Sequence, residues 1–263
     1  MLFLSFLCRM DISVVIICKN EAHIIANTLQ SLQAVSRDIV VVDSGSTDDT
    51  VAICKQYGAT VIKTGWGGYG VNKNMGITAA RNDWILSLDA DEAIDEALQQ
   101  SLLQQNLAND KEVFDLRFKN FFCGKWIRYG EWGFDWHIRL FNRRQVTWNN
   151  AAVHENLLFP EGVKITRLKG NVLHYTVQNR QEYDAKTDHY ARMNAKKYFA
   201  AGKKPGAFKM VFSPLFAFVQ HYIFRLGFLD GAEGWIIATT TARYTYLKYK
   251  YLGELHRQSL TKI

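Results

Sequence analysis

Four short apolar segments recur in the first ninety residues, and polar turns separate them. They cover residues 12–18, 39–43, 60–64 and 84–88. Most of them are continuous and rich in β-branched side chains, which is typical of strands buried on both faces of a parallel sheet. Each predicts a strand of one central sheet.

Helical patterns alternate with these segments. Apolar residues recur at helical spacing in residues 24–32, 50–57, 71–80 and 95–106. Strands that alternate with helices predict the α/β class with a mostly parallel central sheet.

The pattern changes after residue 110. Residues 113–122 alternate like a strand, residues 126–136 predict an aromatic loop, and short strands are expected at 139–142 and 171–175. Three helices that are aromatic on one side and basic on the other are predicted at 180–201, 208–225 and 231–254.

Composition favours a folded enzyme body. Hydrophobic residues make up 48% of the 263 residues, with only three prolines, which excludes a disordered or fibrous chain. The cysteines show no metal or disulfide spacing, so we expect a reducing compartment, the cytosol. They are Cys8, Cys18, Cys54 and Cys123.

Charge divides the chain in two. Residues 1–110 hold 7 Lys and Arg against 13 Asp and Glu, whereas residues 111–263 hold 25 against 12. The second half therefore suits an anionic surface or ligand. No nucleic-acid-binding motif accompanies this charge, so no nucleic acid partner is expected.

A membrane surface is the expected partner of the basic half. Residues 210–224 lack charged side chains but are too short to span a bilayer, and lysines precede them. This combination favours an interfacial position on anionic lipid. We expect a catalytic domain at 11–178, a helical membrane-associating region at 179–263, and an upstream extension at 1–10.

Acidic and amide side chains follow three of the predicted strands. Asn20 and Glu21 follow the first, Asp43 ends the second, and Asp89 and Asp91 follow the fourth. Ligands bind at the carboxyl ends of parallel strands, and paired carboxylates hold Mg²⁺ or Mn²⁺. Helix capping is the alternative for such acids.

The ordered set ISVVIICKNE, VVVDSGSTDDT, KNMGITAARNDWILSLDADE, RLFNR and VHE resembles glycosyltransferase family 2. Members are inverting, nucleotide-sugar-dependent enzymes with the GT-A fold. The resemblance begins at about residue 11 and is closest to bacterial lipopolysaccharide core β-1,4-glucosyltransferases. It implies a GT-A nucleotide-sugar-binding fold with a helical C-terminal extension.

The resemblance implies roles for individual positions. Asp91, with Asp89, would bind the Mg²⁺ or Mn²⁺ that bridges the donor diphosphate. The implied nucleotide-sugar contacts are Asn20, Glu21, Asp43, Lys73 and Asp89. Arg139 faces either the diphosphate or acceptor, or else a structural ion pair.

The general base is expected from the second half of the chain. Glu155 in VHE matches the position of the family's catalytic acid pair, although His154 replaces the usual first acid. Asp135 is the second candidate. His154 or His174 could reach the metal or a phosphate.

The resemblance implies transfer of a hexose, glucose from UDP-glucose, to a heptose of the lipopolysaccharide inner core. The enzyme would work at the cytoplasmic face of the inner membrane. Two alternatives stay open: a polyprenyl-phosphate glycosyltransferase, and a non-catalytic nucleotide-sugar-binding protein that recruits partners to the membrane.

Overall fold

The computed structural model describes residues 11–149 and 155–260. The predicted extension at 1–10 lies outside this range. Contacts divide the described chain into two compact units. The first holds residues 11–118 and 135–174, and the second holds residues 119–134 and 175–260. The boundary expected at residue 178 stays a prediction.

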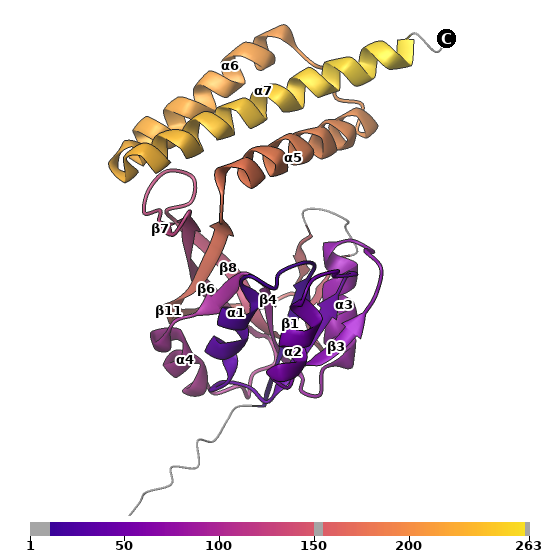
Figure 1. Ribbon diagram of the computed structural model, residues 1–263, viewed down its shortest axis with the longest axis vertical. Helices are drawn as coiled ribbons and strands as arrows, with labels where there is room; N and C mark the ends of the chain where they lie inside the picture. Colours follow the sequence, from indigo (N-terminus) through magenta and orange to yellow (C-terminus); the bar gives the residue numbers. More distant parts are fainter. Residues whose placement is uncertain (1–10, 150–154, 261–263) are drawn as a thin grey trace, which may run out of the picture. The chain divides into compact units, whose positions relative to one another are not determined.

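Four parallel strands form one half of the main sheet, in the order β3-β2-β1-β4 (Figure 1). All four coincide with the apolar segments that predicted them. They are β1 (Ile12–Cys18), β2 (Asp38–Asp43), β3 (Thr60–Lys63) and β4 (Trp84–Asp89). The predicted α/β class is confirmed and these four strands are parallel as expected, whereas the sheet as a whole is mixed.

The other half of the sheet contains antiparallel pairs and continues the order as β8-β6-β11-β5. These strands are β5 (Glu92–Ile94), β6 (Glu112–Phe122), β8 (Asp135–Asn142) and β11 (Lys164–Val177). Three short strands complete the set: β7 (Lys125–Trp126) pairs with β6, and β9 (Thr147–Trp148) pairs with β10 (Leu157–Leu158).

The prediction holds only in part in this half, where β6 matches the strand expected at 113–122. Residues 126–136 were expected as loop, but β7 and the start of β8 lie there, and β8 and β11 are longer than expected. The extra residues of β8 (135–138) alternate polar and apolar over only four positions, and those of β11 are mostly polar without a regular alternation. Cross-strand pairing provides the missing reason, because Leu116 of β6 lies opposite His137 of β8.

Helices cover both faces of the parallel strands, and the alternation along β1 shows how. Val14 and Ile16 join the core formed with α1 (Ile25–Leu32), α2 (Thr50–Gln56) and α4 (Glu96–Leu103). Val15 points to the opposite face, where α3 (Tyr69–Ala79) contributes Ile77. The sheet is thus buried on both sides, as continuous apolar strands require.

The second unit contains the three predicted helices. They are α5 (Arg180–Ala200), α6 (Ala207–Phe218) and α7 (Ala232–Leu260). Helix α7 packs against both α5 and α6 (Figure 1). A π-helical turn (Val219–Phe224) and a 3₁₀ turn (Gly227–Asp230) connect α6 to α7.

Asp230 joins this connection to the segment before β8. Its carboxylate accepts hydrogen bonds from the backbone N–H groups of Arg128 (3.1 Å) and Tyr129 (2.8 Å), and it is 4% exposed.

Within the two described stretches of chain, no helix is both long and apolar enough to cross a bilayer.

Gly76 sets how closely α3 approaches the sheet. A Cβ at this position would lie 2.5 Å from Val15 Cγ1 and 3.0 Å from Val42 Cγ2. In Gly76→Ala, overpacking costs about 1–3 kcal/mol, against a helix-propensity gain of about 1 kcal/mol. We expect a net loss in the free energy of unfolding, measured by urea denaturation.

Gly65→Ala is the matched control for that measurement. Apart from its chain neighbours, no atom of the described residues lies within 4 Å of a Cβ built at Gly65, so the stability of this variant should change by less than about 0.5 kcal/mol. Equal stability of the two variants would contradict the close packing of α3.

Candidate active site

Strand register brings the predicted acids to one edge of the sheet. In the parallel pairs of β1, Cys18 lies opposite Asp43 of β2, and Ile17 lies opposite Asp89 of β4. Both carboxylates therefore lie at the carboxyl ends of their strands, at the same edge of the sheet. This confirms the expected convergence of the strand ends.

Hydrogen bonds connect the loop after β1 to the loop after β2. The buried carboxylate of Asp43 accepts hydrogen bonds from the backbone and the hydroxyl of Ser46. The Asn20 side chain accepts one from Thr47 N–H (2.8 Å), and Thr50 Oγ1 accepts one from Glu21 N–H (2.8 Å). Asn20 has a φ of 56°, a left-handed conformation that asparagine tolerates better than most residues.

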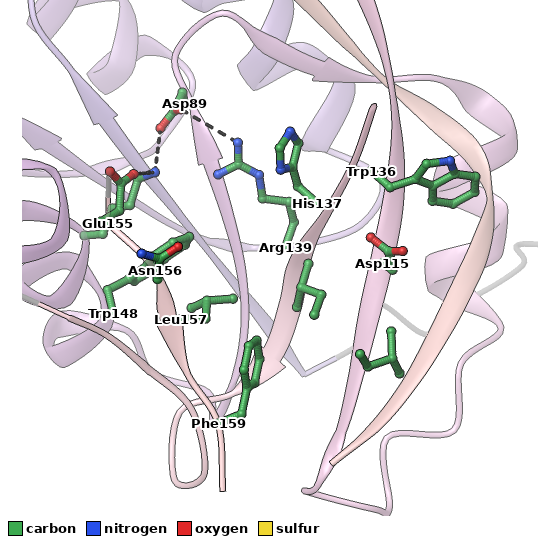
Figure 2. Close-up of a pocket in the computed structure, with 13 residues that line it drawn as sticks. Asp89, Asp115, Trp136, His137, Arg139, Trp148, Glu155, Asn156, Leu157 and Phe159 are labelled. Atoms are coloured by element: carbon green, nitrogen blue, oxygen red, sulfur yellow. Dashed lines mark hydrogen bonds and ion pairs between the residues drawn. The ribbon is translucent and has the colours of Figure 1, made fainter. Parts of the chain in front are cut away.

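Lys73 lies at the centre of a second cluster. It is 2% exposed, and its ammonium donates to Glu155 Oε1 at 2.8 Å and lies 3.3 Å from Asp89 Oδ1. The ring of Trp148 lies 4.6 Å from the same nitrogen. Figure 2 shows Asp89 and Glu155 converging on this ammonium. Three sequence-predicted site residues are thus in direct contact.

Gly70 allows this contact. It lies one turn before Lys73 on α3, and a Cβ there would lie 1.9 Å from the Asn149 carbonyl oxygen and 3.5 Å from Glu155 Cβ. Only glycine permits such a close approach. The backbone of Asn149 and the side chain of Glu155 therefore lie directly against the start of α3.

Glu92 belongs to this site although the sequence did not single it out. It is 1% exposed, its Oε1 accepts from Arg139 at 2.6 Å, and its Oε2 accepts from the Asp89 N–H at 2.9 Å. Arg139 also lies 3.9 Å from Asp89 and covers the Phe118 ring. The adjacency of Glu92 to the D-x-D was its only sequence signal.

Arg139 therefore takes the structural ion pair that the sequence left as one of two alternatives, and it also lines the cavity described below. The permanent positive charge of this buried arginine favours the ionised forms of the carboxylate it pairs with and of the second one nearby. The Glu92 carboxylate accepts hydrogen bonds both from the backbone of the D-x-D turn and from Arg139. It therefore holds the turn and the arginine in fixed positions.

The ionisation of the cluster follows from burial and from neighbouring charge. Burial acts to raise the pKa of Asp89, but the fields of Lys73, Arg139 and His174 outweigh it and lower that pKa. Burial raises the pKa of Glu92 in spite of Arg139. Asp89 is thus held as an anion among cations.

Asp91 makes a separate pair with His174 of β11, at 3.5 Å. Burial opposes protonation of this histidine, but the hydrogen bond and charge of Asp91 prevail and raise the pKa of His174 to about 9. Within residues 11–149 and 155–260, no three acidic, histidine or cysteine side chains form a group that could hold a metal alone.

The donor set nevertheless suits a cation completed by substrate. The Asp91 side chain is 26% exposed, and Asp89 Oδ1 has only its ion pair to Lys73 and no hydrogen bond. Mg²⁺ is commonly held by one or two carboxylates together with substrate phosphates and water. The two aspartates could therefore hold part of such a site. His154 lies outside the described residues.

Asp135 is placed on β8, where it pairs with His137 at 2.7 Å. His137 lines a cavity of about 470 Å³ whose wall also includes Lys73, Asp89, Arg139 and Glu155. The wall also includes Trp136, Phe159, Ile165 and a further carboxylate, Asp115. Figure 2 shows Asp115 close to Trp136. A wall with both charged and aromatic side chains suits a polar ligand with apolar ring faces.

The chain belongs to glycosyl transferase family 2, whose domain matches residues 13–157. It is therefore a nucleotide-sugar-dependent glycosyltransferase. This confirms the family, the enzyme class and the GT-A fold predicted from the ordered motifs.

Three similar proteins illustrate the relationship. The lipopolysaccharide core biosynthesis glycosyltransferase LpsC of Rhizobium meliloti is 30% identical over 94% of both chains. An uncharacterized glycosyltransferase of Rickettsia typhi is 28% identical over 94% of this chain and 88% of its own. Among solved structures, S. aureus TarS with UDP-GlcNAc covers 95% of this chain and 92% of its own at 16% identity and a TM-score of 0.44.

Glu92→Gln tests the support of the D-x-D turn. Removing one partner of a buried ion pair typically costs about 3–5 kcal/mol, and it leaves Arg139 without its nearest carboxylate. We expect a clear drop in the unfolding midpoint, measured by thermal denaturation followed by circular dichroism.

Glu96→Gln provides the control. Glu96 is an exposed residue in the first turn of α4, so the midpoint should stay close to that of the unchanged protein. If Glu92→Gln were as stable as this control, the pair with Arg139 would not support the fold.

Proposed function

We propose that this enzyme transfers glucose from UDP-glucose to a heptose of the lipopolysaccharide inner core, with inversion and with the help of Mg²⁺ or Mn²⁺. The single observation that carries the proposal is the contact of Lys73 with Asp89 and Glu155 on the wall of the cavity. The similarity to LpsC along nearly the whole chain supports a lipopolysaccharide acceptor.

Each residue has a role that its surroundings suit. Asn20, Glu21 and Asp43 bind the nucleotide, because they lie at the same edge of the sheet as Asp89. Lys73 and Arg139 stabilise the negative charge that develops on the departing diphosphate. A divalent cation held by Asp91 and Asp89 would neutralise part of the same charge when bound.

Glu155 acts as the general base. It takes the proton of the acceptor hydroxyl while the oxygen attacks C1 of the donor sugar and the bond to the diphosphate breaks. Attack on the face opposite the leaving group converts an α-linked donor into a β-glycoside. Asp135, which already pairs with His137, is the second candidate for this role.

The ion pair of Lys73 with Glu155 gives this mechanism an order. A carboxylate that accepts from an ammonium at 2.8 Å is poorly available to a hydroxyl proton. A donor diphosphate carries more negative charge than one carboxylate and competes for Lys73. Donor binding would therefore release Glu155 for the acceptor.

The acceptor also sets where the enzyme works. A lipopolysaccharide core is built on a lipid anchor, so we propose that the protein works at the cytoplasmic face of the inner membrane, in contact with an anionic membrane surface. The excess of basic residues after residue 110 supports this location.

UDP release from UDP-glucose, UDP-galactose and UDP-N-acetylglucosamine, with and without Mn²⁺, tests the proposal. Inner-core lipopolysaccharide is the acceptor. We expect metal-stimulated, acceptor-dependent release with UDP-glucose. UDP binding without release from any donor would instead favour a non-catalytic recruitment protein.

Glu155→Gln should lower transfer about 10²–10⁴-fold, the usual contribution of a general base, while UDP binding persists. Transfer is measured under saturating donor, and circular dichroism checks the fold. Glu161→Gln, which changes an exposed glutamate of the same segment, should keep full activity. A loss of only a few-fold in Glu155→Gln would point to an acceptor that is already anionic, such as a polyprenyl phosphate.

Asp91→Asn should remove the stimulation by Mn²⁺, because an amide is a weaker cation ligand than a carboxylate. Activity is measured across a Mn²⁺ titration. Asp49→Asn alters an exposed acid before α2 and should leave the titration unchanged. An unaltered Mn²⁺ response in Asp91→Asn would remove Asp91 from the metal site.

A further inference from the structure

Helix α6 carries an exposed apolar face. Its members follow the i, i+3, i+4, i+7, i+8 spacing that places side chains on one side of a helix, and each is between 50% and 71% exposed. They are Phe208, Val211, Phe212, Leu215 and Phe216. The rings of Phe208 and Phe212 stack at 4.2 Å.

The apolar surface continues past the end of the helix. Ile223, Phe224 and Leu226 are 49%, 74% and 43% exposed. Helix α6 already has a packed side, because it lies along α7 and Phe218 contacts Trp235 at 5.4 Å (Figure 1). The outward face is therefore additional to the core, and contiguous exposed apolar surface of this kind marks an interaction site.

Positive charge accompanies this face. Residues 189–229 contain seven Lys and Arg and no Asp or Glu. Lys203, Lys204 and Lys209 are exposed at the start of α6, and Arg225 is exposed beyond its end. An apolar face with cations at both ends matches an anionic lipid headgroup layer above hydrocarbon.

We propose that α6 lies in the plane of an anionic bilayer surface, with this face inserted at the boundary between headgroups and acyl chains. Twelve residues of helix extend about 18 Å, against about 30 Å of hydrocarbon, so the helix lies along the surface. Pro214 supports this depth. It lacks the N–H that would pair with the Met210 carbonyl, and interfacial water can satisfy that oxygen.

A second copy of the chain suits this face less well. In a symmetric dimer through α6 the same cations would border both sides. Residues 189–229 offer no acid to pair with them, and like charges facing each other weaken association. Lipid phosphates supply the negative charge that the chain lacks here.

Flotation with vesicles of phosphatidylcholine alone, or with 30% phosphatidylglycerol, tests the proposal on the full chain. We expect binding to the anionic vesicles that falls with salt. Phe212→Ser with Phe216→Ser should lower the partition coefficient at least about tenfold, because two large apolar groups no longer leave water. Lys203→Gln with Lys204→Gln should lower it several-fold on anionic vesicles only.

Phe134→Ser is the matched control, since Phe134 is 77% exposed in the same unit but lies outside α6. It should bind vesicles like the unchanged protein. Unchanged binding by the double phenylalanine variant would overturn the proposal. So would a lipid-free dimer that this variant converts to a monomer in sedimentation velocity, with no vesicle binding by either form.

This inference deepens the proposed function, because an enzyme with a lipid-anchored acceptor must reach a membrane surface. The two can fail separately. Flotation needs neither donor nor acceptor, and transfer to a delipidated core oligosaccharide in solution should be equal in the unchanged protein and in Phe212→Ser with Phe216→Ser.

Discussion

The burial of the Lys73 ammonium constrains the rest of the first unit. Removing such a charge from water costs several kcal/mol unless carboxylates pair with it. Asp89 from the end of β4 and Glu155 from beyond β9 provide that pairing. Helix α3 must therefore lie close to both, and the glycines at 70 and 76 permit that approach on its two sides. The pairing of the buried Lys73 ammonium with two carboxylates is thus a requirement of both the fold and the site.

Features that depend on neighbouring residues could be predicted from the sequence. Apolar strands followed by acids indicated the shared edge of Asp43 and Asp89, because strand period and turn composition are local. Pairs distant along the chain could not be predicted. Glu92 and Arg139 are 47 residues apart, and the sequence around each of them does not indicate that they pair. Strands β8 and β11 are longer than predicted for the same reason, since their ends are stabilised by cross-strand neighbours.

The two halves of the chain use charge in opposite ways. In the first unit, acids and cations neutralise one another around a cavity, so a charged substrate must exchange partners with an existing pair. In the second unit, residues 189–229 contain no acid. Arg192 pairs with Asp188 just before this segment, whereas Lys203, Lys204, Lys209 and Arg225 are exposed to an external anion. The net charge of +7 over the whole protein therefore combines an acidic first half with a strongly basic second half.

The hydrogen bonds of Asp230 also affect the order in which the protein can mature on the ribosome. The amides of Arg128 and Tyr129 precede their acceptor by about 100 residues. At about 5–20 residues per second, roughly 5–20 s pass before that carboxylate is synthesised. During this interval the segment before β8 lacks these two hydrogen bonds, although the last strand of the sheet, β11, is synthesised before the interval ends. Ribosomal pausing in the C-terminal third would prolong the time that this segment spends without them.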